Sequence, residues 1–153
     1  MWSPSVFLTS FLTLSEPTLF LTPEEAQFAF YHAFEQNDLE AMMRVWDNGD
    51  DILCIHPMAP ALHGRDAVTH GWREIFTGRV DMHFSVEAIQ RYEQADLVVL
   101  IVNENIEVGS GKRVAPIVST NIYRMSTQGW HMLTHHAGPA PSGEIDHENQ
   151  ALH

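Results

Sequence analysis

The sequence predicts an α+β domain in which three N-terminal helices lie on the concave face of a strongly curved, cone-shaped antiparallel sheet. Up to residue 78, three segments carry apolar residues at helical spacing and have helix-start or helix-stop residues at their ends. After residue 78, apolar or alternating runs are separated by short turns that contain Gly, as is typical of antiparallel strands. Helices gathered on one face of such a sheet form two layers around one core, and the open end of the cone is a natural ligand cavity.

The first helix is predicted to begin at Pro23. Thr22 can cap it, Pro23 suits the first helical position, and Glu25 completes a capping box. Asn37 and Asp38 end this helix and cap a second, short one. Two apolar stripes follow at helical spacing. They are Phe30, Ala33 and Phe34 in the first helix, and Leu39, Met42, Met43 and Trp46 in the second.

A short strand over residues 52–56 and a third helix complete the first half. Pro57 ends the strand, because proline has no N–H for a ladder bond. The third helix opens at Gly64 and ends at Gly78. Its apolar face comprises Val68, Trp72, Ile75 and Phe76.

The second half is predicted to consist of four long strands. Residues 80–90 alternate between apolar and polar, whereas residues 97–102 are continuously apolar, as in a central strand covered on both faces, and this strand runs on to residue 108. Gly turns then lead into strands over 113–125 and 129–141. The predicted organisation is an N-terminal extension (1–21), one domain (22–141) and a flexible polar tail (142–153).

Composition excludes several classes of protein. Twenty acidic residues against eight basic ones give a net charge of −12, which repels nucleic acid and anionic membranes. Cys54 is the only cysteine, so no intrachain disulfide forms and the expected location is the cytoplasm. The apolar N-terminal segment has no basic residues before it and is broken by Ser, Thr, Glu and Pro, so neither a secretion signal nor a membrane span is expected.

Several residues, taken in order, resemble a known family. They are Trp46 before an acidic turn, Ile55-His56-Pro57, Gly64, Trp72 with Phe76, Thr120-Asn121-Ile122-Tyr123-Arg124, and Gly129-Trp130 followed by His136-Ala137-Gly138-Pro139-Ala140-Pro141. On them, residues 22–141 resemble the nuclear transport factor 2-like superfamily, in its SnoaL-like branch near the ketosteroid isomerases. They are also similar to the association domain of calcium/calmodulin-dependent protein kinase II. The resemblance implies a homodimer formed through the outer face of the sheet and a cavity between sheet and helices. It does not imply one activity.

Adjacent histidines on the last strand must face opposite ways. The resemblance to the kinase association domain makes the Ala137 side the pocket side, which places His135 in the cavity beside Asn121 and leaves His136 outside. His56 ends a strand on the side that the family implies is the cavity. Each imidazole can act as an acid or a base near neutral pH, or can simply hydrogen-bond within the structure.

The polar triplet at 103–105 follows six apolar residues. Alternation allows either Asn103 and Asn105, or Glu104, to face the cavity. If Glu104 faces an apolar cavity, desolvation raises its pKa and makes it a proton-transfer group. An ordinary exposed strand end with Glu104 in water is the alternative.

Aromatic residues are predicted to line or close the cone, or to form its core. Trp46, Trp72 and Tyr31 are the candidates for ligand contact. Ketosteroid isomerases use a tyrosine hydroxyl in an oxyanion hole, so the resemblance directs attention to Tyr31. The general-base aspartate of those isomerases and the Asp-Arg-Asp set of epoxide hydrolases have no match in this sequence.

The sequence thus predicts a protein that binds a small, largely apolar molecule. If it is an enzyme, the expected chemistry is cofactor-free proton transfer of an isomerase, cyclase or dehydratase, with His135, His56 or Glu104 as acid or base. Asn121, Trp72, Tyr31, Trp46 and Asn103 are the predicted ligand contacts. No metal is expected, because metal-binding spacings are absent. The alternative is a non-catalytic binding or oligomerisation domain.

Overall fold

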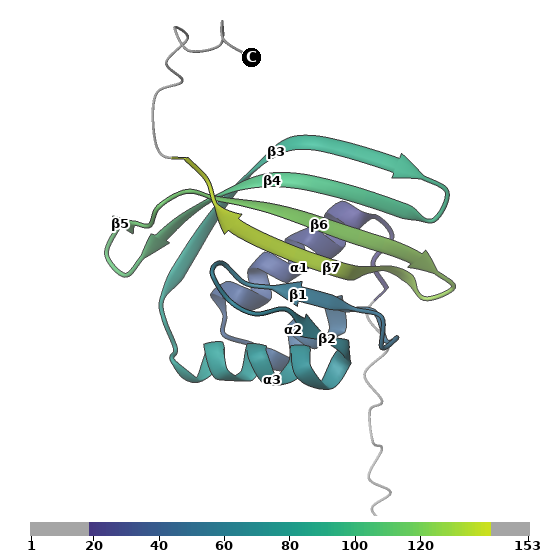
Figure 1. Cartoon of the computed structure of the whole chain (residues 1–153), viewed down its shortest axis with the longest axis horizontal. Coiled ribbons are helices and arrows are strands. Elements are labelled where there is room, and N and C mark those ends of the chain that lie inside the picture. The colour runs from purple at the N-terminus through teal and green to yellow at the C-terminus, as the bar shows by residue number, and fades with distance from the viewer. Residues whose placement is uncertain (1–18, 142–153) are drawn as a thin grey trace, which may run out of the picture.

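A computed structural model describes residues 19–141 of the chain. Three helices lie on one side of a sheet (Figure 1). The helices are α1 (Pro23–Glu35), α2 (Leu39–Val45) and α3 (Gly64–Thr77), and the strands are β1 (Leu53–Ile55), β2 (Leu62–His63), β3 (Met82–Gln94), β4 (Leu97–Val108), β5 (Lys112–Arg113), β6 (Ile117–Ser126) and β7 (Gly129–Pro139). The predicted α+β class is confirmed, and the predicted helices and long strands occur in the expected order, with two short strands, β2 and β5, in addition. The cone shape and the strong curvature stay predictions.

The sheet is mixed and mostly antiparallel. Its strands follow the order β2-β1-β7-β6-β4-β3, and β5 pairs with the far end of β4. The predicted antiparallel pairing holds for the long strands, whereas β1 pairs with β7 in parallel. The reason is that β1 comes from the helical half of the chain and lies beside the last strand in the same direction. This pairing sets Cys54 opposite His135.

Helix caps form where the sequence predicts them. The Thr22 hydroxyl accepts a hydrogen bond from the backbone N–H of Glu25 at 3.1 Å, and Pro23 is the first helical residue. The Asp38 carboxylate accepts from the backbone N–H of Ala41 at 2.9 Å. These contacts satisfy N–H groups that have no partner inside the helix, and they fix both starting points from local sequence alone.

The second helix ends one residue earlier than its apolar stripe suggests. Trp46 has an extended backbone and forms an isolated parallel bridge with Met132 of β7. The guanidinium of Arg65 donates to the carbonyls of Met43, Trp46 and Asp47, at 2.8 to 3.4 Å. Carbonyls at the end of a helix lack intrahelical partners, so Arg65 from α3 caps α2.

A β-bulge decides which side chains of β7 face the helices. The register between β6 and β7 shifts between Ile122 and Tyr123. Because one extra residue stands in β7 at this point, strict alternation is interrupted, and both halves of the strand bury side chains on one face. The buried residues are Trp130, Met132, His135 and Ala137.

The core lies between the helices and this inner face of the sheet. Its fully buried aromatic centre consists of Phe30, Trp46, Trp72 and Tyr123. Phe20, from the predicted extension, is also buried, and its backbone pairs with Gly129. The remaining part of that extension, residues 1–18, and the predicted flexible tail, 142–153, lie outside the described residues.

An ion-pair cluster joins the sheet to the turn after α2. Arg124 of β6 donates to the carboxylate of Asp47 at 3.0 Å and to that of Asp51 at 2.8 Å. The hydrogen bonds from Arg124 are the main reason that the pKa of Asp51 lies below its ordinary value. Burial alone would raise the pKa of Asp47, but hydrogen bonds from Arg124 and the N–H of Gly49 lower it overall. The cluster fixes the position of the turn at the outer edge of the core.

Candidate functional site

Two buried groups from α1 and β4 form the centre of the candidate site. The Tyr31 hydroxyl donates a hydrogen bond of 2.6 Å to Oε1 of Glu104. Glu104 is only 4% exposed, because it follows Val98, Leu100 and Val102 on the inner face of β4. Of the two arrangements that the sequence left open for the triplet at 103–105, the structure therefore has the one with the carboxylate inside.

The other end of the site is a contact between neighbouring strands. Asn121 of β6 stands directly opposite His135 of β7 in the sheet register. The distance between His135 Nδ1 and Asn121 Oδ1 is 2.7 Å, and both side chains are buried. The predicted inward direction of His135 and its position beside Asn121 are thus observed, and His136 is exposed on the opposite face.

Asn121 joins the two ends into one chain of hydrogen bonds. Its Nδ2 donates to the Tyr31 hydroxyl at 3.2 Å and to Oε1 of Gln27 at 3.2 Å. The chain therefore runs from Glu104 through Tyr31 and Asn121 to His135. We call these four residues the polar cluster. A buried polar group that lacks a partner costs about 1–3 kcal/mol, so the mutual hydrogen bonds allow all four to remain inside an apolar core.

Burial sets the protonation of the polar cluster. It raises the pKa of Glu104, and the nearby hydroxyls of Ser119 and Tyr31 offset this rise only in part. Burial, together with the adjacent Glu104, raises the pKa of Tyr31 and keeps its hydroxyl neutral. Burial also lowers the pKa of His135 from 6.5 to about 3, with smaller contributions from His56 and His136. At neutral pH, His135 is therefore a neutral imidazole.

Ser119 is a further buried group beside the carboxylate. It lies on the inner face of β6, and its hydroxyl has no hydrogen-bond partner of good geometry among residues 19–141. Since this hydroxyl nevertheless lowers the pKa of Glu104, it lies near the carboxylate without being aligned with it. Ser119 is thus a spare donor and acceptor next to the acid.

His56 lies apart from the polar cluster. Its Nε2 is 3.5 Å from the Sγ of Cys54, and its ring packs edge-on against Trp72 with centroids 4.7 Å apart. Its ring centroid is 6.3 Å from that of His135, too far for a direct hydrogen bond. Burial lowers the pKa of His56 and raises that of Cys54 to about 12, so this pair is neutral at physiological pH.

Three of the predicted ligand contacts take positions outside the polar cluster. Trp46 and Trp72 are buried in the core, and the indole N–H of each has no partner among the described side chains. Asn103 points to the outer face of β4, opposite Val118 of β6, because it is adjacent to the inward-facing Glu104. The arrangement of the strand therefore separates Asn103 from the site, so of the two alternatives that the sequence left open, the one with Asn103 facing inward is not the one observed.

A groove between α1 and β3 gives access to one member of the polar cluster. Its volume is about 420 Å³, and Tyr31 contributes to its lining. Glu104, Asn121 and His135 do not line this groove. Because Tyr31 touches both the groove and Glu104, it is the contact between the solvent and the buried acid. The remaining lining residues are Glu24, Gln27, Phe28, His32, Glu35, Phe84 and Val86.

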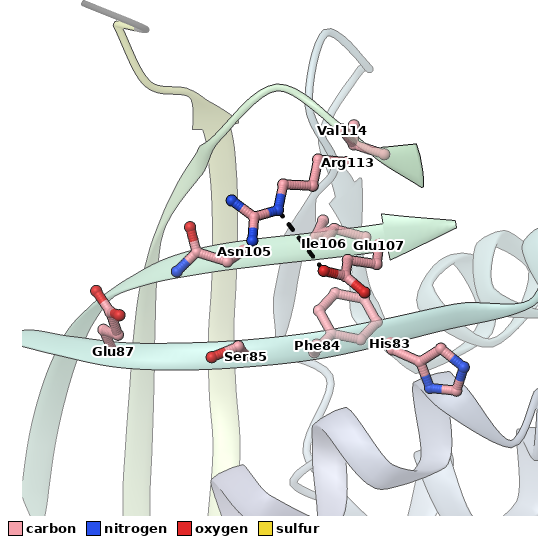
Figure 2. A pocket seen from close by; sticks show the side chains of 9 residues that line it. All are labelled: His83, Phe84, Ser85, Glu87, Asn105, Ile106, Glu107, Arg113 and Val114. Carbon is pink, nitrogen blue, oxygen red and sulfur yellow. Dashed lines mark ion pairs between the residues drawn. The ribbon is translucent and has the colours of Figure 1, made fainter. Parts of the chain in front are cut away.

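A second pocket lies where β3, β4 and β5 meet (Figure 2), and no residue of the polar cluster lines it. Its charged side chains interact with each other at the surface. Nε of Arg113 is 3.6 Å from Oε1 of Glu107, and the Arg113 side chain is 87% exposed. Such an exposed pair is worth about 0–1 kcal/mol, and its groups are held only loosely. The polar cluster, with its short buried bonds, is the better candidate.

Other classes of site find no support in residues 19–141. There, no group of three or more His, Cys, Asp or Glu side chains is placed to hold a metal ion. Nor is any helix of this part long and apolar enough to cross a membrane.

Sequence reasoning missed Gln27 and Tyr123 as neighbours of the polar cluster. Oε1 of Gln27 accepts from Asn121, and the Tyr123 hydroxyl lies 3.4 Å from the same oxygen. Gln27 stands one helical turn before Tyr31, so the spacing of four residues along α1 was the available signal. Tyr123 stands two residues after Asn121 on β6 and shares its face.

Comparisons with known proteins find the same fold. Residues 24–141 match the family model of the SnoaL-like domain. A proposed calcium/calmodulin-dependent protein kinase type II association domain from Thiobacillus denitrificans is 42% identical, with a TM-score of 0.78 over 81% of this chain and 99% of that chain. A proposed dehydratase of the nuclear transport factor 2-like family from Streptomyces avermitilis is 29% identical, with a TM-score of 0.69 over 76% of this chain and 92% of that one.

A curated relative is longer than the shared domain. The F-box protein SKIP8 of Arabidopsis thaliana is 26% identical over 108 residues. The match covers 71% of this chain and 45% of that protein. The chain thus spans less than half the length of the curated relative that it matches.

Proposed function

The chain belongs to the SnoaL-like domain family of nuclear transport factor 2-like fold, and on this basis we propose that it binds a small, largely apolar molecule and catalyses cofactor-free proton transfer. The observation that carries the proposal is the 2.6 Å hydrogen bond between the buried Tyr31 hydroxyl and Glu104. The proposed reaction is an isomerisation or elimination in which a carboxylate removes a proton from carbon and a nearby hydroxyl stabilises the enolate oxygen.

The roles of the residues follow from their environments. Glu104 is the proposed base, because burial raises its pKa and so makes its carboxylate a stronger base than an exposed one. Tyr31 is the proposed hydrogen-bond donor to the substrate, since it lines the groove that reaches solvent. In the structure the Tyr31 hydroxyl donates to Glu104, so a substrate must accept this bond in place of the carboxylate as it binds.

The test uses small β,γ-unsaturated ketones, whose isomerisation gives a conjugated enone that is followed by ultraviolet absorbance. The wild-type protein is expected to accelerate the reaction, and Glu104→Gln to reduce kcat by about 10²- to 10⁴-fold, as is usual when an acid–base group is removed. Glu87→Gln, which changes an exposed carboxylate in the second pocket, is the matched control and should leave the rate unchanged. Equal rates for wild type and Glu104→Gln would refute a catalytic role.

Such a result would favour a non-catalytic role in binding or assembly. This second candidate is supported by the 42% identity to the proposed kinase association domain. In that case the polar cluster only orders the core, and substitution within it should change the melting temperature without changing any turnover.

Assembly itself is a separate proposal: two copies associate through the outer face of the sheet. This face of β4 and β6 carries a half-buried apolar patch in which Val99 stands directly opposite Ile122. Patches of this kind mark protein interfaces. Sedimentation equilibrium should give a dimer for the wild type and for Val114→Glu, an exposed control beyond β5, but a monomer for Ile122→Glu. A monomeric wild type would overturn the proposal.

A further inference from the structure

Every hydrogen bond along the polar cluster points toward the carboxylate. Tyr31 donates to Glu104, and Asn121 donates to Tyr31 through Nδ2. The amide oxygen of Asn121 can only accept, so the 2.7 Å contact with His135 requires the imidazole proton to be on Nδ1. The ring is neutral, which leaves Nε2 as a free acceptor. An ionised Glu104 thus goes together with one tautomer of His135.

We propose that Asn121 is a positioning residue that couples the charge of Glu104 to the tautomer of His135. Once Glu104 holds a proton, its hydroxyl can donate to the Tyr31 oxygen, and the Tyr31 hydroxyl then needs an acceptor. A half-turn of the Asn121 amide supplies its oxygen to Tyr31 and turns its NH2 group toward the imidazole. His135 then accepts at Nδ1 and carries its proton on Nε2.

The proton balance of this change is simple. Glu104 gains one proton from solvent, whereas His135 gives up the proton on Nδ1 and takes one on Nε2, so that the imidazole stays neutral. The amide oxygen and the NH2 group of Asn121 exchange places, so Asn121 still accepts a hydrogen bond from one neighbour and donates one to the other. Gln27, whose oxygen accepts from Asn121, can exchange its own amide ends in the same way. Tyr31, Asn121 and Nδ1 of His135 therefore each have a hydrogen-bond partner in both states, as low-cost reversal requires.

The groups around Glu104 and His135 limit which other protonation changes can occur in the polar cluster. Glu104 is faced by the hydroxyls of Tyr31 from α1 and Ser119 from β6, with Tyr123 farther along β6. Both tyrosines stay neutral because burial raises their pKa values. His135 is faced by His56, beyond β1, and has His136 as its strand neighbour.

The inference deepens the proposed function, on which its catalytic meaning rests, because it assigns complementary states to two groups of one site. An ionised base goes with an accepting Nε2, and a protonated acid goes with a donating Nε2–H. Its test does not need turnover, so its failure can be told apart from failure of the proposed function.

The experiment is ¹⁵N NMR of the protein labelled at histidine, titrated from about pH 7.5 to about pH 4, above the pH at which a buried His135 takes a second proton. The expected result is that the His135 proton changes from Nδ1 to Nε2 while the ring stays neutral. Glu104→Gln removes the titrating group and should abolish this pH dependence. His56→Gln removes the nearest competing imidazole and should leave the change in place.

Two results would overturn the proposal. One is a His135 tautomer that stays the same across the range in the wild type, as expected if the protonated Glu104 donates to Ser119 instead of Tyr31. The other is a change of the same size in Glu104→Gln, which would place its origin elsewhere. The NMR spectrum also reports whether each variant is folded, so a loss of structure cannot be mistaken for a loss of coupling.

Discussion

Removing the imidazole of His135 should change the pH dependence of stability in a predictable direction. We consider His135→Asn, whose side-chain amide can still donate to Asn121 but cannot titrate. The folded protein holds His135 neutral down to about pH 3, whereas the unfolded chain takes up a proton near pH 6.5. The free energy of unfolding contributed by this group is therefore complete above pH 6.5 and is lost as the pH falls toward 3.

The magnitude follows from the two pKa values. Each pH unit below 6.5 removes about 1.4 kcal/mol from the wild type until the folded state also begins to take up the proton, so the loss is about 3 kcal/mol at pH 4.5 and about 4 kcal/mol at pH 3. At pH 7.5 the variant should be the less stable protein by about 1–2 kcal/mol, because it loses packing of the ring against Phe30, whose centroid is 4.9 Å away. The stabilities of the two proteins should therefore cross between about pH 6 and 5.

Urea unfolding at several pH values, followed by tryptophan fluorescence, measures this difference. The control is His136→Asn, which changes an exposed histidine on the opposite face of the same strand. Its free energy of unfolding should stay close to that of the wild type at each pH. A constant difference between wild type and His135→Asn from pH 7.5 to 4.5 would show that His135 is not held neutral, and the account of the polar cluster would be wrong.

Three further predictions concern other contacts. Glu104→Gln should raise the melting temperature at pH 7.5, since the folded state resists ionisation of Glu104, and this advantage should vanish as the pH falls below the ordinary pKa of glutamate. Arg124→Gln should cost about 1 kcal/mol at low salt and less at high salt, whereas Arg113→Gln, at an exposed pair, should change nothing measurable. Gly129→Ala should lower the melting temperature strongly, because φ is +91° and the new Cβ would lie 2.5 Å from the Phe20 carbonyl oxygen, whereas Gly138→Ala meets nothing within 4 Å and should be tolerated.

Each of these has a contradicting outcome. A melting temperature of Glu104→Gln that is lower than that of the wild type at pH 7.5 would mean that the carboxylate is stabilised by its partners. Equal losses of stability in the two arginine variants would mean that the ion pairs of Arg124 with Asp47 and Asp51 stabilise the fold no more than an exposed pair does. Equal effects of the two glycine variants would show that backbone geometry at Gly129 does not limit the fold.

Local sequence determined where the first two helices begin. Thr22 with Pro23, and Asp38, set the starts of two helices because their effects act within one helical turn. Strand β4 could be predicted because its apolar run is long and the strand itself ends at a turn that begins with Gly109. The resemblance added the family, which the match over residues 24–141 confirms.

The tertiary structure decided which face each polar group occupies. Leu97 to Val102 are all apolar, so alternation along the strand could not predict which face Glu104 takes. Only packing against Tyr31, 73 positions earlier, decides it. The bulge in β7 similarly puts Met132 and His135 on one face, which strict alternation forbids. The parallel pairing of β1 with β7 is equally non-local. Short-range signals come from backbone conformation within one turn, whereas facing and register depend on contacts between distant segments, and these exist only once the chain has folded.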